Sequence, residues 1–159
     1  MDRIDREILN LLSANGRMTH EEIGQHLHLS RPSVHQRVAR LEREGILRGY
    51  RAVVNWAQLG EKIQALLFVK IRGSQFHSTV DHILALQVPG LTLVECQRLA
   101  GEWCLLLKVR VADPQAITAL IDQMLLLPAV LETSTTFILT TLLEDGLTRP
   151  IAEEPKGSE

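Results

Sequence analysis

The sequence predicts an α+β protein with an N-terminal winged helix-turn-helix domain and a C-terminal ferredoxin-like βαββαβ sandwich domain. Two observations predict this class. Residues 20–39 contain two short helical patterns separated by a tight turn, which is the arrangement of a helix-turn-helix motif. Residues 63–142 then alternate strand and helix patterns in the order β-α-β-β-α-β, which is typical of the ferredoxin-like fold.

The first helix is predicted from Asp2 to about Ala14. Asp2 is a favourable N-cap residue, and the segment after it carries an apolar stripe at helical spacing. Asn15 and Gly16 end the helix, because both residues tolerate the left-handed conformation found at helix C-termini. The stripe consists of Ile4, Ile8, Leu11 and Leu12.

The second and third helices have clear start signals. Thr19 and Glu22 have the spacing of a capping box, so the second helix begins after Thr19. Gly24 leaves room for the third helix to approach closely. Ser30 caps the third helix, and Pro32 fits its first turn, where a missing N–H has no cost. The residues expected to face the core are Ile23, Leu27, Val34, Val38 and Leu41, and Gly45 closes the third helix.

The rest of the chain divides into three parts after a first domain at residues 1–51. Residues 46–54 alternate as a strand, and 52–62 form a linker. The ferredoxin-like domain covers 63–143, and 144–159 form an acidic, flexible tail. Within this domain we expect strands at 63–72, 91–99, 103–111 and 131–142 and helices at 75–87 and 114–126, separated by Pro and Gly pairs.

The predicted sheet has apolar residues on both faces. In the strand 63–72, Leu67, Val69 and Ile71 lie on one side, and Leu66 and Phe68 lie on the other. An antiparallel sheet with one face in water alternates more cleanly than this. We therefore expect another subunit to cover the second face, the alternative being a loosely patterned sheet with scattered surface apolar residues.

Composition narrows the class of protein. The 159 residues are 45% hydrophobic and contain two cysteines, Cys96 and Cys104. No apolar run approaches the about 18–20 residues of a membrane span, and no secretory signal is present, so we expect a cytoplasmic protein that binds no membrane. Residues 1–51 hold nine arginines against seven acids, whereas the rest holds eight bases against twelve acids. We expect neither a cofactor nor a metal, and no nucleophile–base pair or phosphate loop indicates an enzyme.

The third predicted helix carries the candidate contacts to double-stranded DNA. Its N-terminal half, which meets base edges in such motifs, offers Gln36 for adenine and Arg31 for guanine or a phosphate. Arg40 and Arg43 lie farther along and are expected to contact phosphates. Arg37 lies beside the core and is open to a second role, bracing an acid of the first helix such as Asp5. The full candidate set is Arg31, Ser33, His35, Gln36, Arg37, Arg40 and Arg43.

Together these segments resemble the Lrp/AsnC ("feast/famine") family of prokaryotic transcription regulators. The resemblance lies in AspArgIleAspArgGluIleLeuAsnLeuLeu, in ArgValAlaArgLeuGluArgGluGlyIleLeu and in LeuProAlaValLeuGluThrSerThrThrPheIleLeu, in that order, and covers roughly residues 1–143. It implies dimers formed through the sheets and a strand of the linker, often assembled into tetramers or octamers. It also implies an amino acid or related metabolite bound between dimers, near the loop joining the two central strands.

Two positions depart from the family pattern. The turn position usually held by glycine is His28, a residue that tolerates positive φ better than most. The sensing loop usually ends in aspartate, and here it ends in Cys104, which removes a natural partner for an amino-acid ammonium group. By resemblance the candidate effector site consists of Ala100, Gly101, Glu102, Trp103 and Cys104.

Three alternatives remain open from the sequence. The two-domain layout also resembles that of the sirohaem decarboxylases. The C-terminal domain here, however, has few histidines and arginines that could bind a tetrapyrrole. The missing aspartate makes a ligand-independent, architectural DNA-binding protein plausible. Cys96 and Cys104 flank a predicted hairpin, so they are either a redox pair or ordinary strand cysteines.

Overall fold

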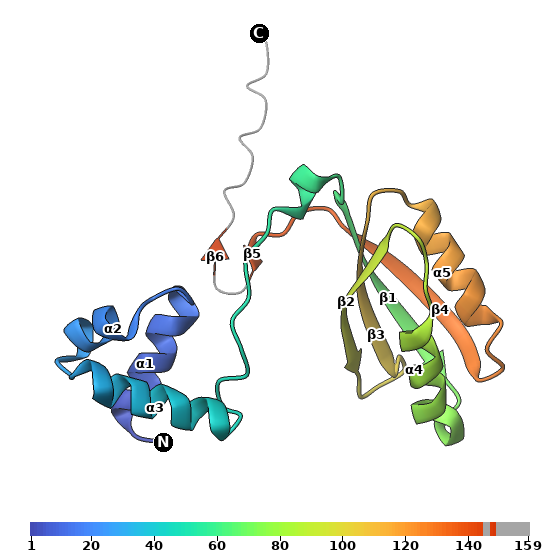
Figure 1. The fold of residues 1–159 in the computed structure, drawn as a ribbon. Coiled ribbons are helices and arrows are strands. Elements are labelled where there is room, and N and C mark those ends of the chain that lie inside the picture. The colour runs from blue at the N-terminus through green and yellow to red at the C-terminus, as the bar shows by residue number, and fades with distance from the viewer. Residues whose placement is uncertain (145–146, 149–159) are drawn as a thin grey trace, which may run out of the picture. The chain divides into compact units, whose positions relative to one another are not determined.

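The computed structural model describes residues 1–144 and 147–148, and the chain forms two compact units, Met1–Val54 and Asn55–Glu159. The first unit contains three helices (Figure 1). They are α1 (Arg3–Ala14), α2 (His20–Leu27) and α3 (Arg31–Arg43). They enclose a small core of Ile8, Leu12, Ile23, Val34, Val38 and Leu41.

The predicted caps form as expected. Asp2 and Asp5 exchange backbone-to-side-chain hydrogen bonds of 2.8 and 2.9 Å in a capping box at the start of α1. Thr19 and Glu22 form a second capping box, and Ser30 accepts a hydrogen bond from the backbone N–H of Ser33. These bonds satisfy amide groups that a helix N-terminus leaves without partners.

The predicted strand at 46–54, and with it the wing, is wrong for the single chain. Residues 46–54 form neither helix nor strand, and the next regular element is a short 3-10 helix, η1 (Trp56–Leu59). A strand exists only when its backbone bonds to a neighbouring strand. The alternating pattern could not supply that partner.

The second unit has the predicted order of elements. Its strands are β1 (Ile63–Ile71), β2 (Leu91–Arg98), β3 (Leu105–Val111) and β4 (Val130–Ile138), with helices α4 (Phe76–Ala85) and α5 (Gln115–Leu125). A short 3-10 helix, η2 (Gly73–Gln75), precedes α4. The sheet order is β2-β3-β1-β4 with antiparallel neighbours, as the ferredoxin-like fold requires.

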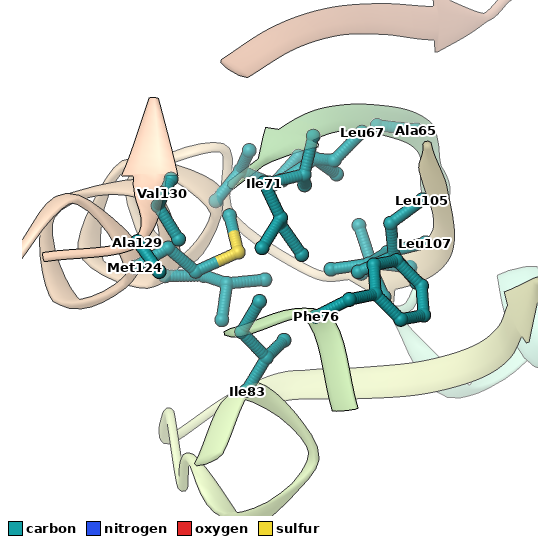
Figure 2. Packing of buried hydrophobic residues seen from close by; sticks show 14 of the residues in the cluster. Ala65, Leu67, Ile71, Phe76, Ile83, Leu105, Leu107, Met124, Ala129 and Val130 are labelled. Atoms are coloured by element: carbon teal, nitrogen blue, oxygen red, sulfur yellow. The ribbon is translucent and has the colours of Figure 1, made fainter. Parts of the chain in front are cut away.

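One face of this sheet forms the main core with α4 and α5. Figure 2 shows side chains of β1 and β3 meeting Phe76 and Ile83 of α4 and Met124 of α5. We call this the inner face. On β1 it consists of the buried residues Ala65, Leu67, Val69 and Ile71, which alternate with less buried residues as the sequence predicts.

The strand β4 ends earlier than expected, at Ile138 rather than residue 142. Ile138 pairs with Gln64, at the beginning of β1, so residues beyond it have no strand beside them. A two-stranded hairpin follows, formed by β5 (Leu143–Glu144) and β6 (Leu147–Thr148). Apart from these residues, the predicted tail at 144–159 lies outside the described part of the chain. Among the described residues no helix is long and apolar enough to cross a bilayer.

Candidate DNA interface and sensing loop

The turn between α2 and α3 depends on two residues with special backbone demands. His28 ends α2 in the left-handed conformation, with φ 55° and ψ 43°, and so performs the role usually given to glycine. Gly24 is needed because a Cβ there would lie 2.6 Å from the backbone oxygen of Leu29. The close approach predicted for Gly24 is thus made by the turn itself, and the backbone N–H of Leu29 donates to the Gly24 oxygen at 2.9 Å.

Most of the predicted DNA-contacting residues line one shallow groove on α3. The inward residues Val34, Val38 and Leu41 are buried, which leaves the polar residues at the intervening positions. His35 and Gln36 are exposed, and Ser33 is half-buried. The groove is lined by Ser33, His35, Gln36, Arg37, Ala39, Arg40 and Arg43, and the exposed Arg31 lies at the N-terminus of the same helix.

A buried carboxylate organises two arginines of this groove. Asp5 has no exposed surface. Its Oδ1 accepts a hydrogen bond from Arg37 at 2.8 Å, and its Oδ2 accepts one from Arg40 at 2.6 Å. Arg37 also donates to Asp2 at 2.6 Å. The brace proposed for Arg37 is therefore present, and Arg40, for which only a phosphate contact was expected, shares it.

These contacts keep both acids charged. The guanidinium of Arg37 and the backbone amide of Asp5 lower the pKa of Asp2 to about 2. For Asp5, burial alone would raise the pKa, but hydrogen bonds from the Asp2 amide and Arg37, with the charge of Arg40, outweigh burial and lower it. The cluster Asp2–Asp5–Arg37–Arg40 therefore joins the start of α1 to α3 through charged hydrogen bonds.

The candidate sensing loop lies between β2 and β3. Ala100, Gly101 and Glu102 are exposed, and Gly101 has a φ of 140°. Trp103 is half-buried and packs against Phe68 of β1, with ring centroids 6.3 Å apart. The loop thus lies against β1 in the folded unit.

Sequence reasoning missed the residue that ties this loop to the sheet. The Nζ of Lys70 lies 3.1 Å from a carboxylate oxygen of Glu102, 2.8 Å from one of Glu132 and 5.0 Å from the Trp103 ring centroid. Lys70, Glu132 and the loop are far apart in sequence and meet because β1 pairs with β4 at this position. No sequence motif marks Lys70.

Cys104 has partners of its own. The backbone N–H of Ile71 donates to its Sγ at 3.1 Å, and its own N–H donates to the Val69 oxygen at 3.2 Å. Cys96 and Cys104 are free thiols, and Cys96 pairs with Leu107, three positions beyond Cys104 on the neighbouring strand. Three residues of strand span about 10 Å, too far for a disulfide. Cys96 lies on β2 and Cys104 directly before β3, and the two do not form a redox pair.

A helix-turn-helix with a polar groove on its second helix, followed by a ferredoxin-like domain, defines a DNA-binding protein with a second, separate domain. Residues 1–42 match the family model of the AsnC-type helix-turn-helix domain, and residues 64–148 match that of the Lrp/AsnC ligand binding domain. The chain belongs to the Lrp/AsnC family and is a DNA-binding transcriptional regulator of that type.

Individual relatives agree with this assignment. The chain is 38% identical to the leucine-responsive regulatory protein of Klebsiella pneumoniae over 144 residues, which cover 85% of this chain and 82% of that protein. The structure of LrpC from B. subtilis is 27% identical, with a TM-score of 0.76 over 89% of this chain and 96% of that one. These relatives are regulators and not enzymes, which decides against the decarboxylase alternative.

A third relative was solved with a ligand. It is a transcriptional regulator from Neisseria meningitidis in complex with L-Met, 26% identical, with a TM-score of 0.79 over 91% of this chain and 93% of that one. Members of the family therefore bind amino-acid effectors.

Proposed function

We propose that this regulator binds a pseudo-palindromic DNA site as a dimer in the cytoplasm, with α3 of each copy in the major groove. The observation that carries this proposal is the groove on α3, which collects polar and basic side chains on one exposed face. Half-sites then lie about 10 base pairs apart, or a multiple of that, because the major groove returns to the same side of the duplex once per helical turn.

The residues of the groove have different roles in this proposal. Gln36 bonds to adenine, and Arg31 bonds to guanine or a phosphate. Ser33 and His35 lie beside them at the base edges, and Arg43 contacts a phosphate. Arg37 and Arg40 are held by Asp5 on one side. The exposed N–H groups of the two guanidinium ends approach the DNA backbone in an orientation that this acid sets.

Substitutions on α3 should separate base recognition from phosphate contact. We expect Gln36→Ala to change the preferred base at one position of the site by about tenfold, the equivalent of one good base contact. We expect Arg43→Ala to weaken binding to all sequences and to reduce the slope of log affinity against log salt by about 1. Binding selection on randomised half-sites and anisotropy titrations at several salt concentrations measure both effects.

The matched control is Arg17→Ala, which removes an exposed arginine outside the groove. Its affinity and salt slope should equal those of the wild type. If Gln36→Ala kept the full base preference at every position, the proposed placement of α3 would be wrong.

The dimer in this proposal forms through the other face of the sheet, which we call the outer face. Its apolar members are Leu66 and Phe68 of β1, Leu106 of β3 and Ile138 of β4, and all four remain partly exposed in the single chain. Phe68 lies directly opposite Leu106, and Ile138 lies diagonally across from Leu66, so the four residues form an apolar group that a second copy can cover. Residues 46–54, which lie outside any strand in the single chain, supply the linker strand that pairs in the dimer, and dimers assemble further into tetramers or octamers.

The effector site in this proposal is the loop of Ala100, Gly101, Glu102, Trp103 and Cys104, and the effector is an amino acid or related metabolite. Support comes from the relative that binds L-Met and from the position of the loop between β2 and β3. Cys104, with its thiol bonded to Ile71, offers no carboxylate to an amino-acid ammonium group. Glu102 is the carboxylate within this loop that is exposed to solvent.

Tryptophan fluorescence tests the effector site. Trp56→Phe leaves Trp103 as the single tryptophan, because the chain contains two. We expect the true effector to shift or quench Trp103 emission saturably, and Glu102→Gln to weaken that response. L-Met, L-Leu and the other amino acids form the panel. No response across the panel, with DNA binding intact, would favour the ligand-independent architectural protein.

A further inference from the structure

An arginine of the outer face is almost fully buried in the single chain. Arg110 of β3 is 8% exposed, although it lies opposite Gln64 of β1 and Thr92 of β2 on the face that α4 and α5 leave open. A buried arginine requires charged or aromatic partners, because its desolvation is otherwise unfavourable. Both partners of Arg110 come from the segment that precedes β1.

The contacts of Arg110 hold this segment on the sheet. Its Nε donates to a carboxylate oxygen of Glu61 at 2.7 Å, and its guanidinium carbon lies 4.1 Å from the ring centroid of Trp56. The backbone N–H of Glu61 donates to the Trp56 oxygen at 3.1 Å. Gly60 makes the required turn with a φ of 93°. A forked, planar cation suits this arrangement, because it can bond to a carboxylate and stack on an indole at once.

The contacts of Arg110 with Trp56 and Glu61, which we call the clamp, lie at the N-terminal limit of the second unit. That unit begins at Asn55, directly before Trp56, and residues 48–54 form neither helix nor strand. The clamp therefore holds the first residues of the second unit on its sheet. The distance that a DNA-binding unit can reach depends on where its linker is attached to the sheet. The attachment point therefore affects which spacings of two half-sites a dimer can bind.

We propose that Arg110 is a positioning residue that anchors the linker through Trp56 and Glu61 and thereby sets the half-site spacing that the dimer accepts. The proposal rests on the proposed dimeric binding of paired half-sites. Loss of the anchor releases residues 56–61 from the sheet and so lengthens the connection between the sheet and the linker strand of the proposed dimer. Each DNA-binding unit then reaches a wider range of spacings, while its own contacts to a half-site are unchanged.

The experiment measures affinity for DNA duplexes with one half-site, and with two half-sites at a series of spacings, using the full chain. For the wild type we expect one preferred spacing, bound at least about tenfold more tightly than the others. Arg110→Met should reduce this preference to less than about threefold and leave the affinity for one half-site unchanged. Trp56→Ala should do the same through the other side of the clamp.

The matched control is Arg98→Met. Arg98 also stacks on an aromatic ring, with its guanidinium carbon 4.4 Å from the Phe76 centroid, but it lies on β2 away from the linker. Its spacing preference should equal that of the wild type. A merely structural role would change thermal stability without changing the preferred spacing.

Each outcome decides a different point. A spacing preference that survives both Arg110→Met and Trp56→Ala overturns the anchor and leaves dimeric binding intact. If Arg110→Met fails to fold, Trp56→Ala alone decides. If a second half-site does not raise the affinity of the wild type at any spacing, the proposed dimeric binding is wrong. The proposed role of Arg110 in half-site spacing is then wrong as well.

Discussion

Replacing Asp5 by Asn is expected to lower the free energy of unfolding of the N-terminal unit by about 3 kcal/mol. Removing one partner of a buried ion pair costs about 3–5 kcal/mol, because the remaining charge loses its compensation. The lower end applies here, since Arg37 and Arg40 retain 27% and 39% of their side-chain exposure. A loss of about 3 kcal/mol is a large part of the free energy of unfolding of a unit as small as the N-terminal one.

Thermal and urea unfolding of the full chain, followed by far-UV circular dichroism, measure this effect. Glu7→Gln is the matched control, because it removes the same charge from the same helix. Glu7 pairs with Arg3 at 3.0 Å, but the Arg3 side chain is 89% exposed, so this pair contributes little. Equal unfolding of Asp5→Asn and Glu7→Gln would show that the buried cluster does not stabilise the unit.

The same cluster predicts an acid-sensitive transition. The pKa of Asp2 falls from 3.8 to about 2 on folding, and the pKa of Asp5 is also lowered. A lowered pKa in the folded state contributes stability above the unfolded pKa and loses it as the pH falls through the folded value. Stability from Asp2 is therefore present above about pH 4 and is lost toward about pH 2. Asp5→Asn should show a weaker dependence on pH in this window.

The second large effect is expected for Leu66→Glu on the outer face. A carboxylate at the centre of the proposed dimer interface would be buried without a partner there, so the dimer should dissociate. The single chain should still fold, because Lys108 lies directly opposite position 66 on β3 and can pair with the new charge. We expect a monomer in sedimentation equilibrium and about 100-fold weaker binding to paired half-sites.

Thr118→Glu provides the control, since it adds the same charge at an exposed position of α5 on the opposite side of the sheet. It should leave both the mass and the affinity of the protein unchanged. Binding of Leu66→Glu to one half-site should also equal that of the wild type. A dimeric Leu66→Glu protein would place the interface elsewhere on the molecule.

Much of the fold follows from local signals. The capping boxes at Asp2 and Thr19 act within four residues, so the sequence alone places the starts of α1 and α2. The sheet domain is predicted for a similar reason, because alternation along β1 assigns Leu67 and Val69 to the inner face without knowledge of its neighbours. His28 at the turn was also foreseen, since its left-handed backbone is a local property.

The errors and omissions have one physical origin. The strand expected at 46–54 needs a partner that the single chain does not provide, and β4 ends at Ile138, opposite Gln64, where its pairing with β1 stops. The positions of Cys96 and Cys104 on either side of a predicted hairpin also left a redox pair open, but the register of β2 with β3 separates the two cysteines. Each case depends on which strands become neighbours.

The sequence by itself therefore determined the class of protein, the order of its elements and the polar face of α3, because caps, alternation and helical spacing act over a few residues. Only the tertiary structure decided that Arg40 shares Asp5 with Arg37, that Lys70 binds the candidate sensing loop and that Arg110 contacts both Trp56 and Glu61. These contacts join residues more than thirty positions apart. Their geometry is set by the packing of whole elements, which no local pattern records.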